Sequence, residues 1–368
     1  MYHKKMQLLQ IIARFNQGGT ARWLTSLVSG LRLQGAQVEL LAGNVHLGEV
    51  EDQSFLELNG IRIPSLARNP SIFKDFQAFL RIRKLIIQYK PEILNTHTTK
   101  AGAVGRIAAI SILSKRPKIV HTIHGHLLYG YFSKTKTRAY VLIEKVLFHY
   151  TDVIVVPGVK VMEDLISAGI GDRTKYRVVL PGVEKPTSDV NLNLKEKYQI
   201  PSETVVVGWV GRLTPIKRPF LVLELAKLFK EVHFLIAGDG EMRIELEKNS
   251  PSNVHFLGWE NPAVVWENCD IALLTSANEA IPISLIEAGL FSKPIIAEDV
   301  GAVREIVFSG INGFLIKNID QRIQALQSLL DDQELRLEFG MASQRICQEK
   351  FGLQAFISNH LNIYESLL

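Results

Sequence analysis

Short apolar runs alternate with longer amphipathic stretches along most of the chain. The short runs predict buried strands and the amphipathic stretches predict helices. In the first half we expect strands at 6–13, 38–42, 93–96, 118–123, 152–156 and 176–180. Helices are expected between them at 21–34, 72–89, 101–112, 133–150 and 160–168. This alternation is typical of a parallel sheet covered by helices on both faces.

The pattern pauses between about 182 and 203, where Pro186, Pro201 and polar residues predict a linker and a short helix. It then resumes with strands at 204–210, 232–237, 253–257, 270–275, 294–297 and 313–316. Helices are expected at 220–230, 241–248, 301–307, 319–330, 333–348 and 354–367, and one of about ten residues opens near Pro282. The chain is therefore predicted to form two doubly wound α/β domains, at 1–183 and 184–350, followed by a last helix at 351–368. Two such domains imply a ligand-binding cleft between them.

Composition narrows the class of protein. Hydrophobic residues make up 47% of the chain and charged residues 21%, as in ordinary globular proteins. Cys269 and Cys347 lack a CxxC spacing or nearby histidines, so neither a disulfide framework nor a zinc site is expected. No apolar run approaches the ~20 residues of a membrane span. The first run is short and broken by Arg14, which indicates a strand rather than a signal peptide, and we expect a cytoplasmic protein.

The charge is distributed unevenly. Residues 1–183 hold 25 Lys and Arg against 12 Asp and Glu, whereas residues 184–368 hold 17 against 25. This asymmetry fits either drift in solvated surface charge or a first domain that faces an anionic membrane or a phosphorylated acceptor. The basic helix at 72–89 leaves the same choice open, although its apolar positions favour a core stripe: Phe76, Phe79, Leu80, Ile82, Leu85 and Ile86. No motif for binding nucleic acid is present.

Polar residues gather at the predicted carboxyl ends of strands, where parallel sheets bind ligands. Glu279 follows the strand at 270–275, and Glu287 lies about one turn inside the next helix. Arg212 and Lys217 follow the strand at 204–210, and Gly238-Asp239-Gly240 follow the strand at 232–237. Each feature alone also fits a solvated loop or chance spacing. Together they predict a site for a molecule that carries phosphates and hydroxyls, because cations and helix N-termini suit phosphate.

The motifs resemble those of the retaining GT-B glycosyltransferases of family four. GRLTPIK is similar to the family's G-R-L-x-x-x-K loop, and EAIPISLIE is similar to its E-x7-E motif. AGDGEMRIELE, FLGW and VGAVREIV follow the family's order and spacing. The first half carries ARFNQGGTARW, LNTHTTKAGAVGRIAA and HTIHGHLLYGYFSKTKTRAY, which are most like bacterial enzymes that build polysaccharides or lipid-linked glycans. The resemblance implies two Rossmann-like domains that face each other across a cleft.

The resemblance also implies roles for individual residues. Glu279 would hold the donor sugar and stabilise its reacting ring, and Glu287 would bind the nucleotide ribose. Arg212 and Lys217 would hold the diphosphate as it leaves. His124 would lie near the donor sugar, although a structural role at a strand end is the alternative; His97 and His126 are weaker candidates. The remaining donor-binding residues would be Gly18, Gly19, Gly238, Asp239, Ile283, Ser284 and Leu285. The last helix would cross back onto the first domain.

The expected reaction transfers a hexose from a nucleotide-diphosphate sugar with retention of the anomeric configuration, and it uses no metal or cofactor. The expected donor is a UDP-sugar. The acceptor would be a glycan or a polyprenyl-diphosphate-linked glycan of lipopolysaccharide or capsule, met by an enzyme peripheral to the inner face of the membrane. An epimerase or phosphorylase of the same fold and a non-catalytic glycan-binding subunit are the alternatives. Ala280 and Ser292 replace glycines that are usual in the family, and Pro157-Gly158 replace a commoner serine, so the sugar stays open.

Overall fold

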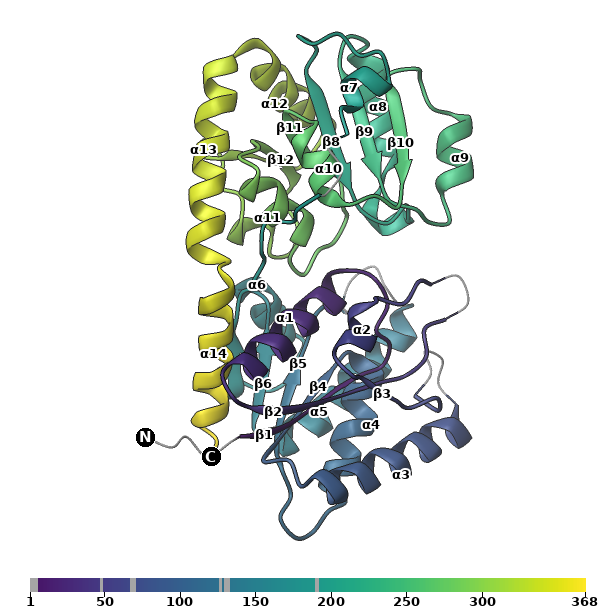
Figure 1. Ribbon diagram of the computed structural model, residues 1–368, viewed down its shortest axis with the longest axis vertical. Helices are drawn as coiled ribbons and strands as arrows, with labels where there is room; N and C mark the ends of the chain where they lie inside the picture. Colours follow the sequence, from purple (N-terminus) through teal and green to yellow (C-terminus); the bar gives the residue numbers. More distant parts are fainter. Residues whose placement is uncertain (1–5, 47–48, 67–70, 126–127, 129–132, 189–191) are drawn as a thin grey trace. The chain divides into compact units, whose positions relative to one another are not determined.

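The computed structural model describes residues 6–46, 49–66, 71–125, 128, 133–188 and 192–368 (Figure 1). The chain divides into two compact units. Unit 1 comprises Met1–Gly182 and Leu353–Leu368, and unit 2 comprises Val183–Gly352. These limits differ by one or two residues from the predicted domain boundaries. The last helix follows unit 2 in the chain and belongs to unit 1.

Unit 1 is built on a parallel sheet of seven strands in the order β3-β2-β1-β4-β5-β6-β7. Leu8 in β1 pairs with Val38 in β2 on one side and with Ile93 in β4 on the other. The central strands are buried almost throughout because helices cover both faces of the sheet, and Gln10, Asn95, Thr96 and His97 are polar residues buried in them. The strands are β1 (Gln7–Ile12), β2 (Gln37–Ala42), β3 (Ile61–Arg62), β4 (Ile93–His97), β5 (Lys118–Thr122), β6 (Val153–Val156) and β7 (Tyr176–Val178).

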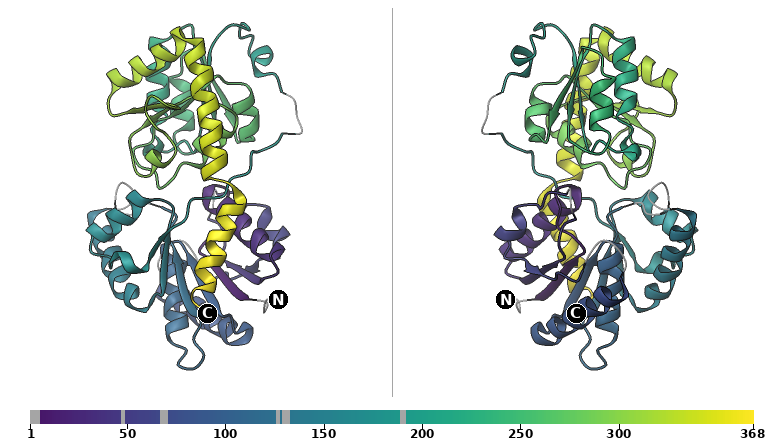
Figure 2. Two further views of the ribbon diagram at one scale, coloured as in Figure 1. Left: turned by 90° about the vertical axis from the view of Figure 1, so that its left-hand side faces the viewer. Right: turned by 90° about the vertical axis from the view of Figure 1, so that its right-hand side faces the viewer.

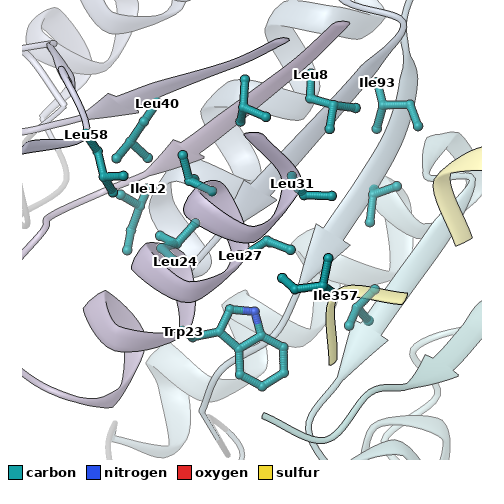
Figure 3. Close-up of a cluster of buried hydrophobic side chains, with 14 of the residues drawn as sticks. Leu8, Ile12, Trp23, Leu24, Leu27, Leu31, Leu40, Leu58, Ile93 and Ile357 are labelled. Carbon is teal, nitrogen blue, oxygen red and sulfur yellow. The ribbon is translucent and has the colours of Figure 1, made fainter. Parts of the chain in front are cut away.

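The helices of unit 1 cover both faces of this sheet. They are α1 (Gly19–Leu33), α2 (Ser54–Glu57), α3 (Ile72–Tyr89), α4 (Thr99–Ile110), α5 (Lys134–Tyr150), α6 (Val159–Ser167), the 3₁₀ turn η1 (Arg173–Lys175) and α14 (Leu353–Glu365). One apolar cluster joins α3 and α4 to the sheet, and a second joins α1 and α14 to it. Figure 3 shows the second cluster, in which Leu24 and Leu27 of α1 lie near Ile12 of β1. A Cβ on Gly30 would lie 2.3 Å from Ile357 Cδ1, so Gly30 lets α14 pack directly on α1.

Unit 2 contains a parallel sheet of six strands in the order β10-β9-β8-β11-β12-β13. The strands are β8 (Val206–Val210), β9 (His233–Ala237), β10 (Val254–Gly258), β11 (Ile271–Leu274), β12 (Ile295–Glu298) and β13 (Gly313–Ile316). The helical elements are α7 (Leu194–Lys197), η2 (Pro215–Lys217), α8 (Phe220–Leu228), α9 (Arg243–Lys248), α10 (Pro262–Glu267), α11 (Ile283–Leu290), η3 (Val303–Glu305), α12 (Ile319–Asp331) and α13 (Gln333–Lys350). Because β8 and β11 are neighbours, their loops emerge side by side at one edge of the sheet.

The fold class is confirmed, since each unit is a Rossmann-like layer of parallel strands between helices. The predicted core stripe of α3 is wrong in part. Phe76 is 59% exposed and Leu80 is 49% exposed, whereas Ile82, Leu85 and Ile86 are buried as expected. The sheet is covered by the other apolar side of the helix, which leaves the first two residues facing outward. Within the described residues, no helix has the length and apolar character needed to cross a membrane.

Candidate active site

Glu279 is a buried carboxylate among the predicted site residues. It lies on the loop between β11 and α11 and is 6% exposed. Its Oε1 atom accepts hydrogen bonds from Lys217 Nζ and from Ser276 Oγ, the latter at 2.6 Å. A buried carboxylate is costly unless it is paired and hydrogen-bonded, so these two donors hold Glu279 in one position. Ser276 is a site residue that the sequence motifs did not identify.

The loop that carries Lys217 is fastened to the end of β11. Thr275 Oγ1 donates to the carbonyl of Lys217 at 2.8 Å, and Trp209 Nε1 donates to Thr275 Oγ1 at 3.0 Å. The backbone N–H of Ala277 donates to Ile216 O at 2.8 Å. These bonds join loops that are about sixty residues apart in sequence, and they place the Lys217 ammonium beside the Glu279 carboxylate.

A second charged cluster contacts the end of β11. Arg218 has a backbone φ of 48°, in the left-handed region that residues other than glycine rarely adopt. Its guanidinium donates to Thr275 O at 2.8 Å and to Ser276 O at 3.1 Å, and it lies 3.2 Å from Glu298. Glu298, at the end of β12, is 5% exposed and also pairs with the buried Arg322. Through Arg218 and Glu298 the cluster ties the end of β11 to the end of β12. The sequence motifs did not identify Glu298, although it directly follows the strand predicted at 294–297.

Two glycines permit close backbone approaches at this edge of the sheet. Gly238 has a φ of 135°, and a Cβ on it would lie 1.8 Å from Gly211 O. The adjacent Asp239 accepts a backbone hydrogen bond from Leu213 at 2.9 Å, which joins the loop after β9 to the loop after β8. Gly301 has a φ of 52°, and a Cβ on it would lie 1.6 Å from Glu279 O. Only glycine fits at either position without movement of a neighbouring backbone.

The start of α11 carries the N–H groups that are predicted to bind the donor. The backbone N–H groups of Leu285 and Ile286 donate to Pro282 O at 3.1 and 3.4 Å. Ile283 and Ser284 come before them, in the first turn, where N–H groups have no acceptor within the helix. Glu287 is the fifth residue of α11 and is 3% exposed. Arg212, by contrast, is an exposed side chain on the loop after β8.

Unit 1 holds a separate cluster around His124, which follows β5. The Nε2 of His97, at the end of β4, donates to Gln10 Oε1 at 2.8 Å, and a 2.7 Å hydrogen bond joins its Nδ1 to His124 Nε2. The two imidazole rings stack with centroids 5.0 Å apart. Burial and the neighbouring His360 lower the pKa of His124 to about 3. Burial, then His124, lowers the pKa of His97 well below its usual value, so both imidazoles are neutral at pH 7.

The same cluster reaches the last helix and the first glycine turn. Tyr364 in α14 accepts a hydrogen bond from Asn95 Nδ2 at 2.9 Å, and its OH lies 3.4 Å from Gln10 Nε2. Trp23, in the first turns of α1, lies edge-on to His124 with ring centroids 5.2 Å apart. Gly18 is the N-cap of α1 with a φ of 141°, and Gly19 is its first residue. The Gly18-Gly19 turn therefore lies at the carboxyl end of β1, two strands from His124.

The structure thus brings Lys217 and Glu279 into contact and places Gly238, Asp239 and the start of α11 on loops at the same sheet edge. It places His124, Gly18 and Gly19 in unit 1. The roles predicted for all of these residues stay predictions. His126 lies outside the described residues. Among the residues that the structure describes, no three His, Cys, Asp or Glu side chains gather in a group suited to a metal ion.

Comparison with known proteins identifies the family. The profile for glycosyl transferases group 1 matches residues 190–345, and the profile for Glycosyltransferase Family 4 matches residues 17–185. An Escherichia coli UDP-Gal:alpha-D-GlcNAc-diphosphoundecaprenol alpha-1,3-galactosyltransferase is 32% identical over 298 residues, which cover 75% of this chain and 76% of that protein. The Staphylococcus aureus capsular polysaccharide biosynthesis glycosyltransferase CapM is 24% identical over 379 residues, covering 94% and 96%.

Solved structures show the same fold. Anabaena HepE in complex with UDP-glucose matches with a TM-score of 0.81 at 20% identity, covering 98% of this chain and all of that chain. The two Rossmann-like units have the fold of the GT-B glycosyltransferases. The chain belongs to the family-four glycosyltransferases, and the group 1 match lies within unit 2. The family prediction from the sequence motifs is confirmed.

Proposed function

We propose that this protein transfers a hexose from a UDP-linked donor to a glycan or polyprenyl-diphosphate-linked acceptor, with retention of the anomeric configuration, during synthesis of a cell-envelope polysaccharide. The observation that carries the proposal is the fixed Glu279 carboxylate, joined to Lys217 and Ser276 on loops at the sheet edge from which α11 begins. The names of the relatives support the substrate classes: one uses UDP-Gal and a diphosphoundecaprenol-linked acceptor, and another serves capsule synthesis.

The donor-binding roles follow from charge and geometry. Lys217 and Arg212 would neutralise the diphosphate, because a compact ammonium and a planar guanidinium both suit phosphate oxygens. The first-turn amides of α11 would add uncharged donors to the same anion. Glu287 would accept hydrogen bonds from the ribose. Because Lys217 and Arg212 would neutralise the charge of the diphosphate, the proposed reaction needs no metal ion or cofactor.

In the proposed reaction, the bond between the anomeric carbon and the β-phosphate oxygen breaks as the acceptor oxygen attacks from the same face. The acceptor proton passes to the departing phosphate oxygen, and UDP leaves. Glu279 would hold the sugar hydroxyls and stabilise the positive charge that develops on the ring, while Lys217 stabilises the leaving charge. His124 would bind the sugar as a neutral hydrogen-bonding group, because its lowered pKa prevents protonation at pH 7.

The experiment supplies a panel of UDP- and GDP-linked sugars together with a GlcNAc-diphosphate-lipid acceptor and identifies the products by mass spectrometry. Proton NMR then gives the anomeric configuration, with EDTA present throughout. The proposal predicts one UDP-sugar as donor and a retained, axial linkage. An inverted product, conversion of the donor without acceptor, a requirement for inorganic phosphate, or abolition of activity by EDTA would each contradict it.

Variants test the residue assignments in the same assay. Glu279→Gln and Lys217→Met should each lower kcat by about 100-fold or more, the usual cost of removing one group that stabilises transition-state charge. Lys227→Met is the matched control, since Lys227 is an exposed lysine on α8 of the same unit. It should leave kcat and KM unchanged. Full activity in Glu279→Gln would exclude the catalytic role proposed for the Glu279 carboxylate.

A further inference from the structure

Large apolar side chains are exposed on two helices of unit 1. On α3, Phe73 is 84% exposed, Phe76 is 59% exposed and Leu80 is 49% exposed. On α5, Leu142 is 64% exposed and Val146 is 54% exposed. The spacing of three or four residues between neighbouring members of each set places them on one side of their helix. Each helix also buries an opposite apolar side against the core, so these exposed residues form a second stripe that the fold of unit 1 does not use.

Both helices pack against α4, on one face of the seven-stranded sheet (Figure 2). Lys100 in α4 pairs with Asp75 in α3 at 2.6 Å. Arg106 in α4 pairs with Glu144 in α5, also at 2.6 Å, and both of these side chains are fully buried. These ion pairs fix α3 and α5 on the same supporting helix. The two exposed stripes therefore belong to one layer of helices.

The charge of this segment is strongly positive. Residues 71–150 contain 14 Lys and Arg but only three Asp and Glu. Two of the acids are the inward ion-pair partners Asp75 and Glu144, and the third, Glu92, accepts a hydrogen bond from the backbone of Gln7 at 3.2 Å. The exposed charged side chains of α3 and α5 are all basic: Lys74, Arg81, Lys84, Lys134, Lys136, Arg138 and Lys145.

Apolar stripes flanked by basic side chains fit a surface that combines a hydrocarbon interior with negative charge. A second copy of this chain would bring one basic surface against another, which disfavours a dimer formed through the same faces. An anionic bilayer satisfies both properties, because phenylalanine and leucine side chains enter the acyl boundary while lysine and arginine meet the headgroups. We propose that the outer faces of α3 and α5 dock this enzyme on an anionic phospholipid bilayer. Its use to reach a lipid-linked acceptor rests on the function proposed above.

The test is co-sedimentation of the full-length protein with vesicles of phosphatidylcholine alone or mixed with phosphatidylglycerol. The wild-type protein should sediment with the anionic vesicles only, and high salt should weaken the binding because it screens the charges. The triple variant Phe73→Ser, Phe76→Ser, Leu80→Ser and the double variant Leu142→Ser, Val146→Ser should each bind at least about tenfold more weakly.

The matched control is the double variant Leu337→Ser, Met341→Ser on α13. These residues are 60% and 64% exposed, as much as the α3 and α5 residues, but they lie in unit 2. The control should bind vesicles like the wild type. A thermal melt of every variant confirms that it is folded. Equal loss of binding in the control, or equal binding to neutral and anionic vesicles, would overturn the proposal.

Two further measurements separate the alternatives. If the exposed stripes form a dimer instead, sedimentation velocity will show a wild-type dimer that the triple variant dissociates, and the membrane proposal fails. Transfer to a water-soluble acceptor analogue should be unchanged in all variants, whereas transfer to an acceptor embedded in vesicles should fall in the α3 and α5 variants. Absence of transfer to either acceptor would refute the proposed function, while anionic vesicle binding that depends on the stripes would still support the docking surface.

Discussion

Replacement of Gly301 by alanine tests how closely activity depends on the position of Glu279. The added Cβ would lie 1.6 Å from Glu279 O, whereas real Cβ atoms essentially never come within 3.0 Å of such an atom. The backbones of residues 279 and 301 must therefore separate by at least about 1.4 Å, since the obstacle is main chain and not the flexible end of a side chain. A misplacement of about 1 Å can cost about 100-fold in rate.

Gly310→Ala is the control for backbone strain. Gly310 has a φ of 77°, similar in sign to the 52° of Gly301, but a Cβ on it would meet nothing within 4 Å. Both variants carry the roughly 1–2 kcal/mol cost of a left-handed alanine. Only Gly301→Ala also displaces Glu279. We expect both to lose stability, and only Gly301→Ala to lose about 100-fold or more in kcat/KM.

The assay combines thermal melts with steady-state kinetics on the identified donor and acceptor. Measurements below the melting temperature of the weaker variant keep both enzymes folded. If Gly301→Ala keeps the kcat/KM of Gly310→Ala, then the placement of the Glu279 backbone does not limit catalysis, and the reasoning from this contact is refuted.

Three further predictions concern stability. Ser292 has a φ of 56°, so Ser292→Gly should raise the free energy of unfolding by about 0.5–1 kcal/mol in urea melts, whereas Ser328→Gly inside α12 should lower it by a similar amount. Burial lowers the pKa of His360 to about 4 from an ordinary 6.5. The neutral imidazole therefore stabilises the fold fully above pH 6.5, and this stabilisation is lost as the pH falls towards 4. Thermal melts of His360→Gln should show a smaller fall in melting temperature over that pH range than the wild type. Arg106→Met should cost about 3 to 5 kcal/mol in denaturant melts because it strands the buried Glu144 carboxylate, and adding Glu144→Leu should recover most of the loss; no recovery in the double variant would contradict this account of the pair.

Most strands were predictable because a parallel sheet buried on both faces leaves short, continuous apolar runs. The boundaries of α3 were predicted at Ile72 and Tyr89, as the structure has them. β3 was missed because its two residues, Ile61–Arg62, are too few to show a pattern. α10 was missed because PAVVWE is short and mostly apolar, and such a run shows no helical period.

The exposed stripe of α3 could not be predicted from the helix alone. Its apolar residues cover more than one side, and only the packing of the unit decides which side is buried. Phe76 and Leu80 were assigned to the core on the assumption that large apolar side chains face inward. In the structure they face outward, while Ile82, Leu85 and Ile86 on another side of the helix are buried.

The candidate site was predictable in its main residues but not in their supports. Glu279 and Lys217 follow neighbouring strands, so the sheet topology alone brings their loops to one edge. Arg218, Glu298 and Arg322 come from three separate segments. Their meeting depends on side-chain reach across β11 and β12, which spacing in the sequence does not encode.

The most direct test of the proposed donor site is calorimetric titration of the protein with UDP and, separately, GDP, ADP and CDP. We expect UDP to bind preferentially to the wild type. Glu287→Ala and Lys217→Ala should each weaken UDP binding by about tenfold or more, since each removes a charged protein side chain that would hydrogen-bond to UDP. Lys227→Ala should bind like the wild type. Failure of every nucleoside diphosphate to bind, or UDP binding that neither site variant weakens, would contradict a donor site at the carboxyl ends of β8 and β11.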